Sequence, residues 1–167
     1  MSGEWKAPIR VAVLTVSDRG AAGKRVDTSG DAIAAWAKDR GFTLAARDVV
    51  PDETDRIAAA LLAWADGGIA DLILTTGGTG LAPRDVTPEA TRAAIEKDAP
   101  GIAEAIRAAG RQAVPRSALS RGLAGVRGRS LIVNLPGSTS GVKDGLAVLE
   151  PLVEHAVAII TGAPTDH

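Results

Sequence analysis

The sequence predicts a single α/β domain in which helices cover a mostly parallel sheet. Apolar runs rich in β-branched residues alternate with segments of helical periodicity along the chain, and this alternation is typical of βαβ units with right-handed crossovers. A length of 167 residues and a hydrophobic fraction of 46% suit one domain with a substantial core. Residues 1–167 are therefore expected to form one domain, with loose termini at residues 1–8 and 163–167.

Local signals place the elements in order. The run IRVAVLTVS is unbroken and β-branched, as expected of a strand buried on both faces. Gly41 ends the first helix, Thr54 is the expected cap of the second, and Pro151 should kink or split the last. The expected elements are strand 9–17, helix 31–40, strand 42–50, helix 55–65, strand 71–75, helix 88–97, a helix from 100 to about 113, strand 130–135 and a helical segment at 142–160.

Four loops follow the predicted strands. They span residues 17–30, 51–54, 76–87 and 134–141. The carboxyl ends of parallel strands share one edge of a sheet, and open α/β sheets bind their ligands beyond that edge. Candidate functional residues are therefore expected in these four loops.

The loop after the third strand is rich in glycine. It contains Gly77, Gly78 and Gly80, together with Thr76 and Thr79. Glycines let backbone amides approach a ligand closely, and consecutive amides form anion-binding nests, so the loop suits phosphate. It is not a P-loop, because no Gly-Lys-Ser/Thr follows, and its GGTG spacing is not the dinucleotide fingerprint. The alternative is a sharp turn that needs glycine for positive φ.

The loop NLPGSTSG, at residues 134–141, follows the same logic. It joins a strand to a helix whose N-terminus favours an anion. Lys143 lies in the first turn of that helix, where a cation is unfavourable for the helix dipole, and this indicates an anionic ligand nearby. The alternative is a capped turn with a solvated lysine.

Two aspartates follow predicted strands. Asp52 comes after the second strand and Asp85 after the third, so the topology can bring both to one crevice. Two carboxylates beside phosphate loops suggest a Mg²⁺-nucleotide site, because Mg²⁺ takes few carboxylates and completes its shell with phosphate oxygens. The alternative for each is a role as a helix cap or in an Asx turn.

Composition narrows the function classes. The chain has no cysteine, no tyrosine and two histidines, which excludes disulfides and a cysteine nucleophile and gives little support to a catalytic triad or a histidine-based zinc site. A net charge of −1 without a basic stripe argues against a nucleic-acid partner. No apolar run reaches the roughly 18 residues that span a membrane. We expect a cytoplasmic protein.

Several motifs occur in a specific order. The segment LTTGGTGLAPRDVTPEAT is preceded by SDRGAAG and PDE and followed by LSRGLAGVRGRSLIVNLPGS. Together these motifs resemble the molybdopterin adenylyltransferase family, the MogA/MoaB group related to the G domain of gephyrin, and the resemblance runs from Ile9 to Gly162. The last loop lacks the PGxP pattern, and the chain is short, so it is most similar to the MoaB branch.

The resemblance implies a fold and a reaction. The fold is a three-layer α/β/α sandwich, usually a homotrimer and sometimes a hexamer. Family members use ATP and Mg²⁺ to adenylylate the terminal phosphate of molybdopterin, release pyrophosphate, and pass the product to a molybdate-insertion enzyme in molybdenum cofactor biosynthesis. Some MoaB proteins are inactive, so the alternative is a non-catalytic molybdopterin-binding or scaffold protein of the same fold.

The resemblance also implies site residues. Asp52 and Asp85 match the family's catalytic carboxylates, which implies that they also hold Mg²⁺. The residues that match substrate- and nucleotide-binding positions are Ser17, Asp18, Thr76, Gly77, Gly78, Thr79, Gly80, Ser120, Arg121, Asn134, Pro136, Gly137 and Ser138.

Overall fold

The computed structural model describes residues 7–162. Most of the two termini that the sequence predicts to be loose, residues 1–6 and 163–167, therefore lies outside the described residues. Ala7 and Pro8, the remaining residues of the first terminus, are exposed.

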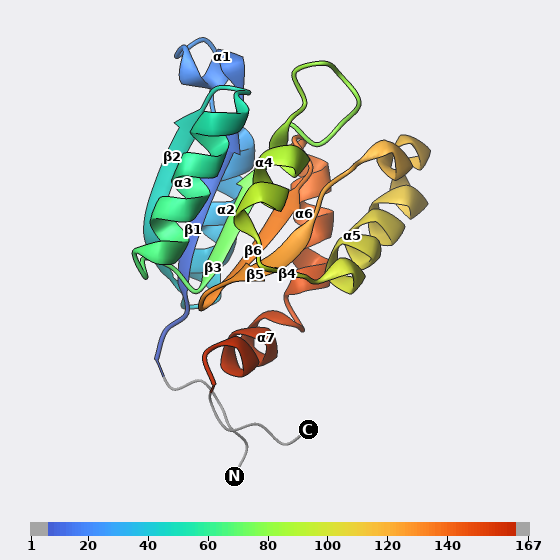
Figure 1. Ribbon diagram of the computed structural model, residues 1–167. Coiled ribbons are helices and arrows are strands. Elements are labelled where there is room, and N and C mark those ends of the chain that lie inside the picture. Colours follow the sequence, from blue (N-terminus) through green and yellow to red (C-terminus); the bar gives the residue numbers. More distant parts are fainter. Residues whose placement is uncertain (1–6, 163–167) are drawn as a thin grey trace.

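A six-stranded sheet with the order β2-β1-β3-β6-β5-β4 forms the centre of the molecule (Figure 1). Four strands are parallel, and β5 and β4 add an antiparallel edge. The strands are β1 Arg10–Val16, β2 Thr43–Val50, β3 Leu72–Thr76, β4 Lys97–Asp98, β5 Ala124–Arg127 and β6 Ser130–Leu135.

Helices cover both faces of the sheet, which confirms the three-layer α/β/α prediction (Figure 1). One core cluster joins the sheet to α2, α5, α6 and α7, and the other joins it to α3 and α4. The helices are α1 Asp18–Ala21, α2 Thr28–Asp39, α3 Thr54–Asp66, α4 Thr87–Ala94, α5 Pro100–Ala113, the 3₁₀ helix η1 Pro115–Leu119, α6 Thr139–Leu149 and α7 Val153–Ile160.

Strand β1 shows why its sequence is apolar without alternation. Val11 and Val13 point into one core cluster, and Ala12 and Leu14 point into the other. All four residues have no exposed surface. A central parallel strand covered by helices on both faces needs an apolar residue at every position.

Several helices begin earlier than predicted, and α6 begins at Thr139 rather than 142. Helix α2 begins at Thr28 rather than 31, because the Asp27 side chain accepts a hydrogen bond from the Gly30 amide and caps the helix earlier.

A short helix, α1, forms in the segment that was predicted to be a loop, and Ser17 caps it. Thr54 is the first residue of α3 and not its cap; that position belongs to Glu53, whose side chain makes no cap hydrogen bond.

The antiparallel edge was not predicted. Helix α4 ends at Ala94 rather than 97, because Ile95 takes up extended backbone and residues 97 and 98 pair with β5. Neither β5 nor η1 was expected from the sequence. The effect of Pro151 was correctly predicted: the last helical segment is split into α6 and α7 on either side of it.

Candidate functional site

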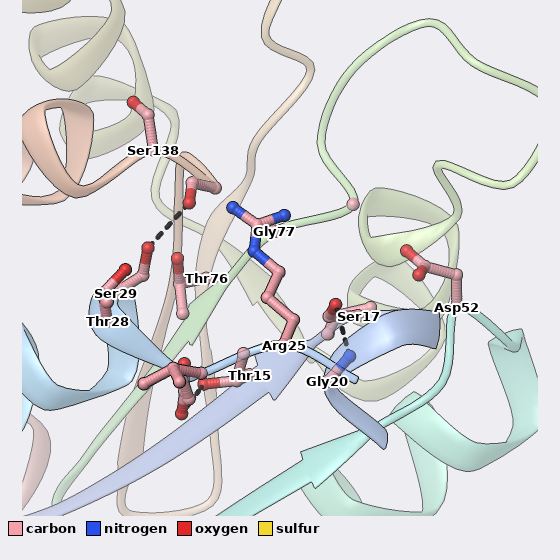
Figure 2. A pocket seen from close by; sticks show the side chains of 15 residues that line it. Thr15, Ser17, Gly20, Arg25, Thr28, Ser29, Asp52, Thr76, Gly77 and Ser138 are labelled. Atoms are coloured by element: carbon pink, nitrogen blue, oxygen red, sulfur yellow. Dashed lines mark hydrogen bonds between the residues drawn. The ribbon is translucent and has the colours of Figure 1, made fainter. Parts of the chain in front are cut away.

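A cavity of about 380 Å³ opens at the carboxyl edge of the parallel strands. Its volume lies within the roughly 300–1,000 Å³ of small-molecule sites. All four predicted strand-end loops contribute to its wall (Figure 2). The lining residues are Thr15, Val16, Ser17, Gly20, Arg25, Val26, Asp27, Thr28, Ser29, Asp52, Thr76, Gly77, Gly78, Gly137 and Ser138.

The glycine pair after β3 is required by its backbone and its neighbours. Gly77 has φ 97° and Gly78 has φ 68°, values that disfavour any residue with a side chain. A Cβ on Gly77 would lie 2.3 Å from the Val16 carbonyl oxygen. A Cβ on Gly78 would lie 2.3 Å from Thr87 Oγ1 and 3.2 Å from Asp52 Oδ1. The loop therefore needs glycine for its turn, as the alternative interpretation states. The same turn brings the Gly78 backbone close to the Asp52 carboxylate.

The same loop also keeps amides available. Within residues 7–162, the backbone amides of Gly78, Thr79 and Gly80 donate to no other residue, whereas the Gly77 amide donates to the Leu135 carbonyl at 3.3 Å. Successive backbone amides that have no acceptor within the protein form a concave anion-binding site at the end of a strand. The strand-turn and phosphate interpretations of this loop are thus compatible.

Asp18 and Asp52 hold each other in place. The Asp18 amide donates to Asp52 Oδ2 at 2.9 Å, and the Asp52 amide donates to Asp18 Oδ1 at 2.9 Å. Arg84 adds two hydrogen bonds to the Asp18 carboxylate, at 2.6 and 2.9 Å. Asp18 is therefore occupied by Arg84 and does not line the cavity, whereas Asp52 does.

The two carboxyls have opposite pKa shifts. Hydrogen bonding to Arg84, followed by the bond from the Asp52 amide, lowers the pKa of Asp18. Burial raises the pKa of Asp52, and the nearby charges of Asp18 and Asp85 add to that rise. A bound cation would reverse this effect on Asp52, because a positive charge favours the ionised form.

Asp85 lies beside the cavity rather than in its wall. Its Oδ2 accepts from the Ala82 amide at 2.9 Å, which closes a local turn. This turn is neither the helix cap nor the Asx turn of the alternative interpretation, because Val86 is the cap of α4 and the donor amide precedes Asp85. A metal held by protein groups alone is not supported, because residues 7–162 contain no cluster of three acidic or histidine ligands. Asp52 by itself fits the usual Mg²⁺ arrangement of one carboxylate completed by substrate phosphates.

Arg121 braces the glycine-rich loop from outside. Its guanidinium donates to the carbonyl oxygens of Gly80 and Asp85, at 2.9 and 2.8 Å, and makes a two-point ion pair with Glu89. Its amide donates to the Thr79 carbonyl at 2.8 Å. Ser120 Oγ accepts from the Gly122 amide. Neither Ser120 nor Arg121 lines the cavity, and Thr79 and Gly80 are likewise held beside it.

The second predicted binding loop divides into a core part and a cavity part. Asn134 lies within β6, only 4% exposed, and its side chain bonds Thr75, Thr91 and the Leu123 amide. The Pro136 carbonyl accepts from Thr76 Oγ1 at 2.6 Å. Gly137 and Ser138 alone of this group reach the cavity.

Most cavity residues that the sequence interpretation missed lie within residues 17–30, the first predicted strand-end loop. Asp27 is the clearest case: its carboxylate accepts from Thr15 Oγ1 at 2.8 Å, from the Gly30 amide at 3.0 Å and from Arg47 at 3.0 Å. The pattern Asp-Thr-Ser-Gly is a helix-cap signature. Recognising it would have placed Asp27 at the start of α2, at the edge where ligands bind.

A cavity lined by hydroxyls, two carboxylates and glycine backbone at the ends of parallel strands lies where α/β domains bind their ligands. The family model described as "Probable molybdopterin binding domain" matches residues 12–155. The chain belongs to that family.

Relatives and solved structures agree. The chain is 38% identical to a molybdopterin adenylyltransferase of Helicobacter pylori, over 92% of this chain and 89% of that protein. It is 42% identical, over 99% of its length, to a molybdenum cofactor biosynthesis bifunctional protein of Synechococcus elongatus, but spans only 56% of that relative. It spans about a quarter of two further relatives. The crystal structure of MoaB from Thermus thermophilus superposes with a TM-score of 0.87 at 50% identity, covering 95% of this chain and 99% of that one.

The helices of residues 7–162 include none with the length and apolarity to cross a membrane.

Proposed function

We propose that this protein is a molybdopterin adenylyltransferase that transfers AMP from ATP to the terminal phosphate of molybdopterin in molybdenum cofactor biosynthesis. The observation that carries the proposal is that Asp52 and Gly78, whose amide is the first of three free amides after β3, line one cavity. The chain also covers nearly all of a relative named for this activity.

The chemistry fits the side chains that are present. A phosphate monoester has a second pKa of about 6, so the attacking phosphate is already ionised near neutral pH and needs no strong base. The phosphate oxygen bonds to the α-phosphorus of ATP, and the bond from that phosphorus to the bridging oxygen breaks, so pyrophosphate leaves with the electron pair. What remains for the protein is positioning and charge neutralisation.

Each wall of the cavity has a part in that task. The Gly78 amide in the wall and the adjacent amides of Thr79 and Gly80 receive phosphate oxygens, and Ser17, Thr28 and Ser138 supply hydroxyls from two other loops, residues 17–30 and 134–141. Asp52 would hold Mg²⁺, which when bound supplies positive charge to the phosphate oxygens. Asp85 remains a predicted catalytic residue, and Asp18 positions Asp52 through the paired backbone bonds.

An adenylylation assay tests the proposal. Purified protein is mixed with molybdopterin, ATP and Mg²⁺, and adenylylated molybdopterin is measured by chromatography. Asp52→Asn should lower kcat/KM on the order of a hundredfold or more, as removal of a charge-organising group does. Asp55→Asn is the matched control, because Asp55 is exposed on the first turn of α3 three residues away.

The same assay on Asp85→Asn decides whether that carboxylate takes part in the reaction or only closes its turn. Molybdopterin binding without turnover in the wild type would contradict the enzyme proposal. It would favour instead a non-catalytic binding or scaffold protein.

We further propose a cytoplasmic homo-oligomer, a trimer or a hexamer, that hands its product to a molybdate-insertion enzyme. The family resemblance supports this assembly. Sedimentation velocity of the purified chain distinguishes trimer, hexamer and monomer, and a monomer at micromolar concentration would contradict it.

A further inference from the structure

Arg25 is the one cationic side chain in the wall of the cavity, as far as the described residues define that wall. Figure 2 shows its side chain extending from the segment between α1 and α2 into the cavity. The other charged residues there are Asp27 and Asp52. The protein wall is therefore net negative, which is unfavourable for a polyphosphate unless its positive charge is placed against the phosphates.

The guanidinium of Arg25 has no partner in the part of the chain that the structure describes. Three other arginines near the site pair with carboxylates: Arg47 with Asp27, Arg84 with Asp18, and Arg121 with Glu89. Arg47 thus satisfies Asp27 from outside the cavity. The five donors of Arg25 are left directed at the space that a ligand would fill.

The segment that carries Arg25 is irregular but tied at both ends. The Lys24 amide donates to the Arg19 carbonyl at 2.9 Å, and Asp27 caps α2 through the Gly30 amide at 3.0 Å. Between these two anchors lie only Arg25 and Val26, and Val26 is 74% exposed. The anchors keep the Arg25 backbone beside the cavity, while its long side chain can still adjust to a ligand.

We propose that Arg25 contacts the β- and γ-phosphoryl groups of the nucleotide and neutralises the charge that gathers on the leaving pyrophosphate. This inference rests on the proposed adenylyl transfer. The reacting α-phosphoryl group belongs beside Asp52 and the amides after β3. Arg25 lines the same cavity from a different, exposed segment, and we assign it to the part of the triphosphate that departs.

Nucleotides with different numbers of phosphates test this role. Binding of AMP, ADP and ATP is measured by titration calorimetry with Mg²⁺ for the wild type and for Arg25→Ala. Loss of a charge-assisted contact should weaken ATP binding by roughly tenfold or more and AMP binding by less than about twofold. Arg25→Lys should recover only part of the loss, because an ammonium lacks the two-point fork.

Lys24→Ala is the matched control. It removes the same charge from the neighbouring position, and Lys24 does not line the cavity. Its ATP affinity and turnover should match those of the wild type. If Arg25→Ala weakens AMP and ATP equally, or weakens ATP no more than Lys24→Ala does, the inference is wrong.

Failure of the proposed function would look different. If the wild type binds no nucleotide, adenylyl transfer fails as the function, and titration with inorganic pyrophosphate then tests Arg25 alone. Pyrophosphate binding that Arg25→Ala weakens and Lys24→Ala does not would keep the contact. Pyrophosphate affinities that agree between the wild type and Arg25→Ala would overturn it.

Discussion

At the scale of single residues, contacts between backbone and carboxylate determine the site. Gly78 brings the strand-end loop within reach of Asp52, and Thr87 fixes that loop by donating from Oγ1 to the Gly77 carbonyl at 2.9 Å. Thr87 is completely buried, so its hydrogen bond is shielded from water. Gly78 and the Thr87 hydroxyl therefore both help to position the free amides.

The first prediction concerns Gly78→Ala. A methyl group there would meet Thr87 Oγ1 at 2.3 Å in addition to the cost of positive φ. Gly68→Ala is the control, because Gly68 has φ 64° and no heavy atom within 4 Å of a Cβ. The control should lose about 1–2 kcal/mol of unfolding free energy, and Gly78→Ala clearly more, together with most adenylylation. Urea unfolding measures the difference, and equal losses would contradict this account.

Residues in recognised motifs can still have structural roles. Asn134 and Arg121 both belong to motifs that resemble a family pocket, but the structure buries Asn134 between Thr75 and Thr91 and commits Arg121 to the Gly80 and Asp85 carbonyls. Local sequence predicts which loop carries a residue. It does not determine the hydrogen-bond partners of that residue. The partners of Asn134, Thr91 and Thr75, lie 43 and 59 positions away along the chain.

At the scale of elements, the sequence was informative where glycine or proline marks a boundary. Pro151 splits the last helix and Gly41 follows the first long one, as predicted. Strands β1, β3 and β6 were found because they are buried on both faces and mostly apolar, whereas the largely exposed β2 was found from its position between Gly41 and Pro51. Strand β5 was missed because AGVR is short and contains Gly125, whose missing side chain lets the Lys97 backbone approach within 2.6 Å of a Cβ position.

The second prediction concerns the ion pair between Arg121 and Glu89, which connects α4 to the loop before it. The Arg121 hydrogen bond lowers the pKa of Glu89. A depressed folded-state pKa means that the ion pair contributes fully above the ordinary carboxyl pKa and that this contribution is lost as pH falls through the lowered value. Glu89→Gln should therefore speed amide exchange of residues 79–86 at neutral pH, and its difference from the wild type should vanish in acid.

Glu104→Gln is the control for that experiment, because Glu104 is exposed on α5 and has no ion pair with any described residue. Its loop exchange should match the wild type at every pH. A Glu89→Gln difference that persists in acid would show that packing of the side chain, rather than its charge, orders the loop.

At the scale of the whole molecule, the site joins parts that are far apart in the chain. Ser29 Oγ on α2 donates to the Gly137 carbonyl at 2.7 Å, and Thr28 bonds Thr139 at 3.1 Å, so the starts of α2 and α6 are linked across more than a hundred residues. The parallel topology places the starts of α2 and α6 beside each other. For this reason the sequence predicts at which edge of the sheet the cavity lies, but not the contacts within it. A ligand held there touches loops from both halves of the sheet.

The third prediction follows from that arrangement. Unfolding must release a ligand bound by four loops, so Mg-ATP at a hundred times its Kd should add about 2.7 kcal/mol to the free energy of unfolding. A domain of this size gains roughly 2–4 °C per kcal/mol, so Tm should rise by about 5–10 °C. A thermal scan followed by circular dichroism at several ATP concentrations measures this rise in Tm.

The Tm of Asp52→Asn should rise less at the same ATP concentrations, because loss of the carboxylate weakens the Mg-ATP complex and not the fold. If ATP does not change the Tm of the wild type, the nucleotide does not bind the folded domain, and the third prediction is wrong.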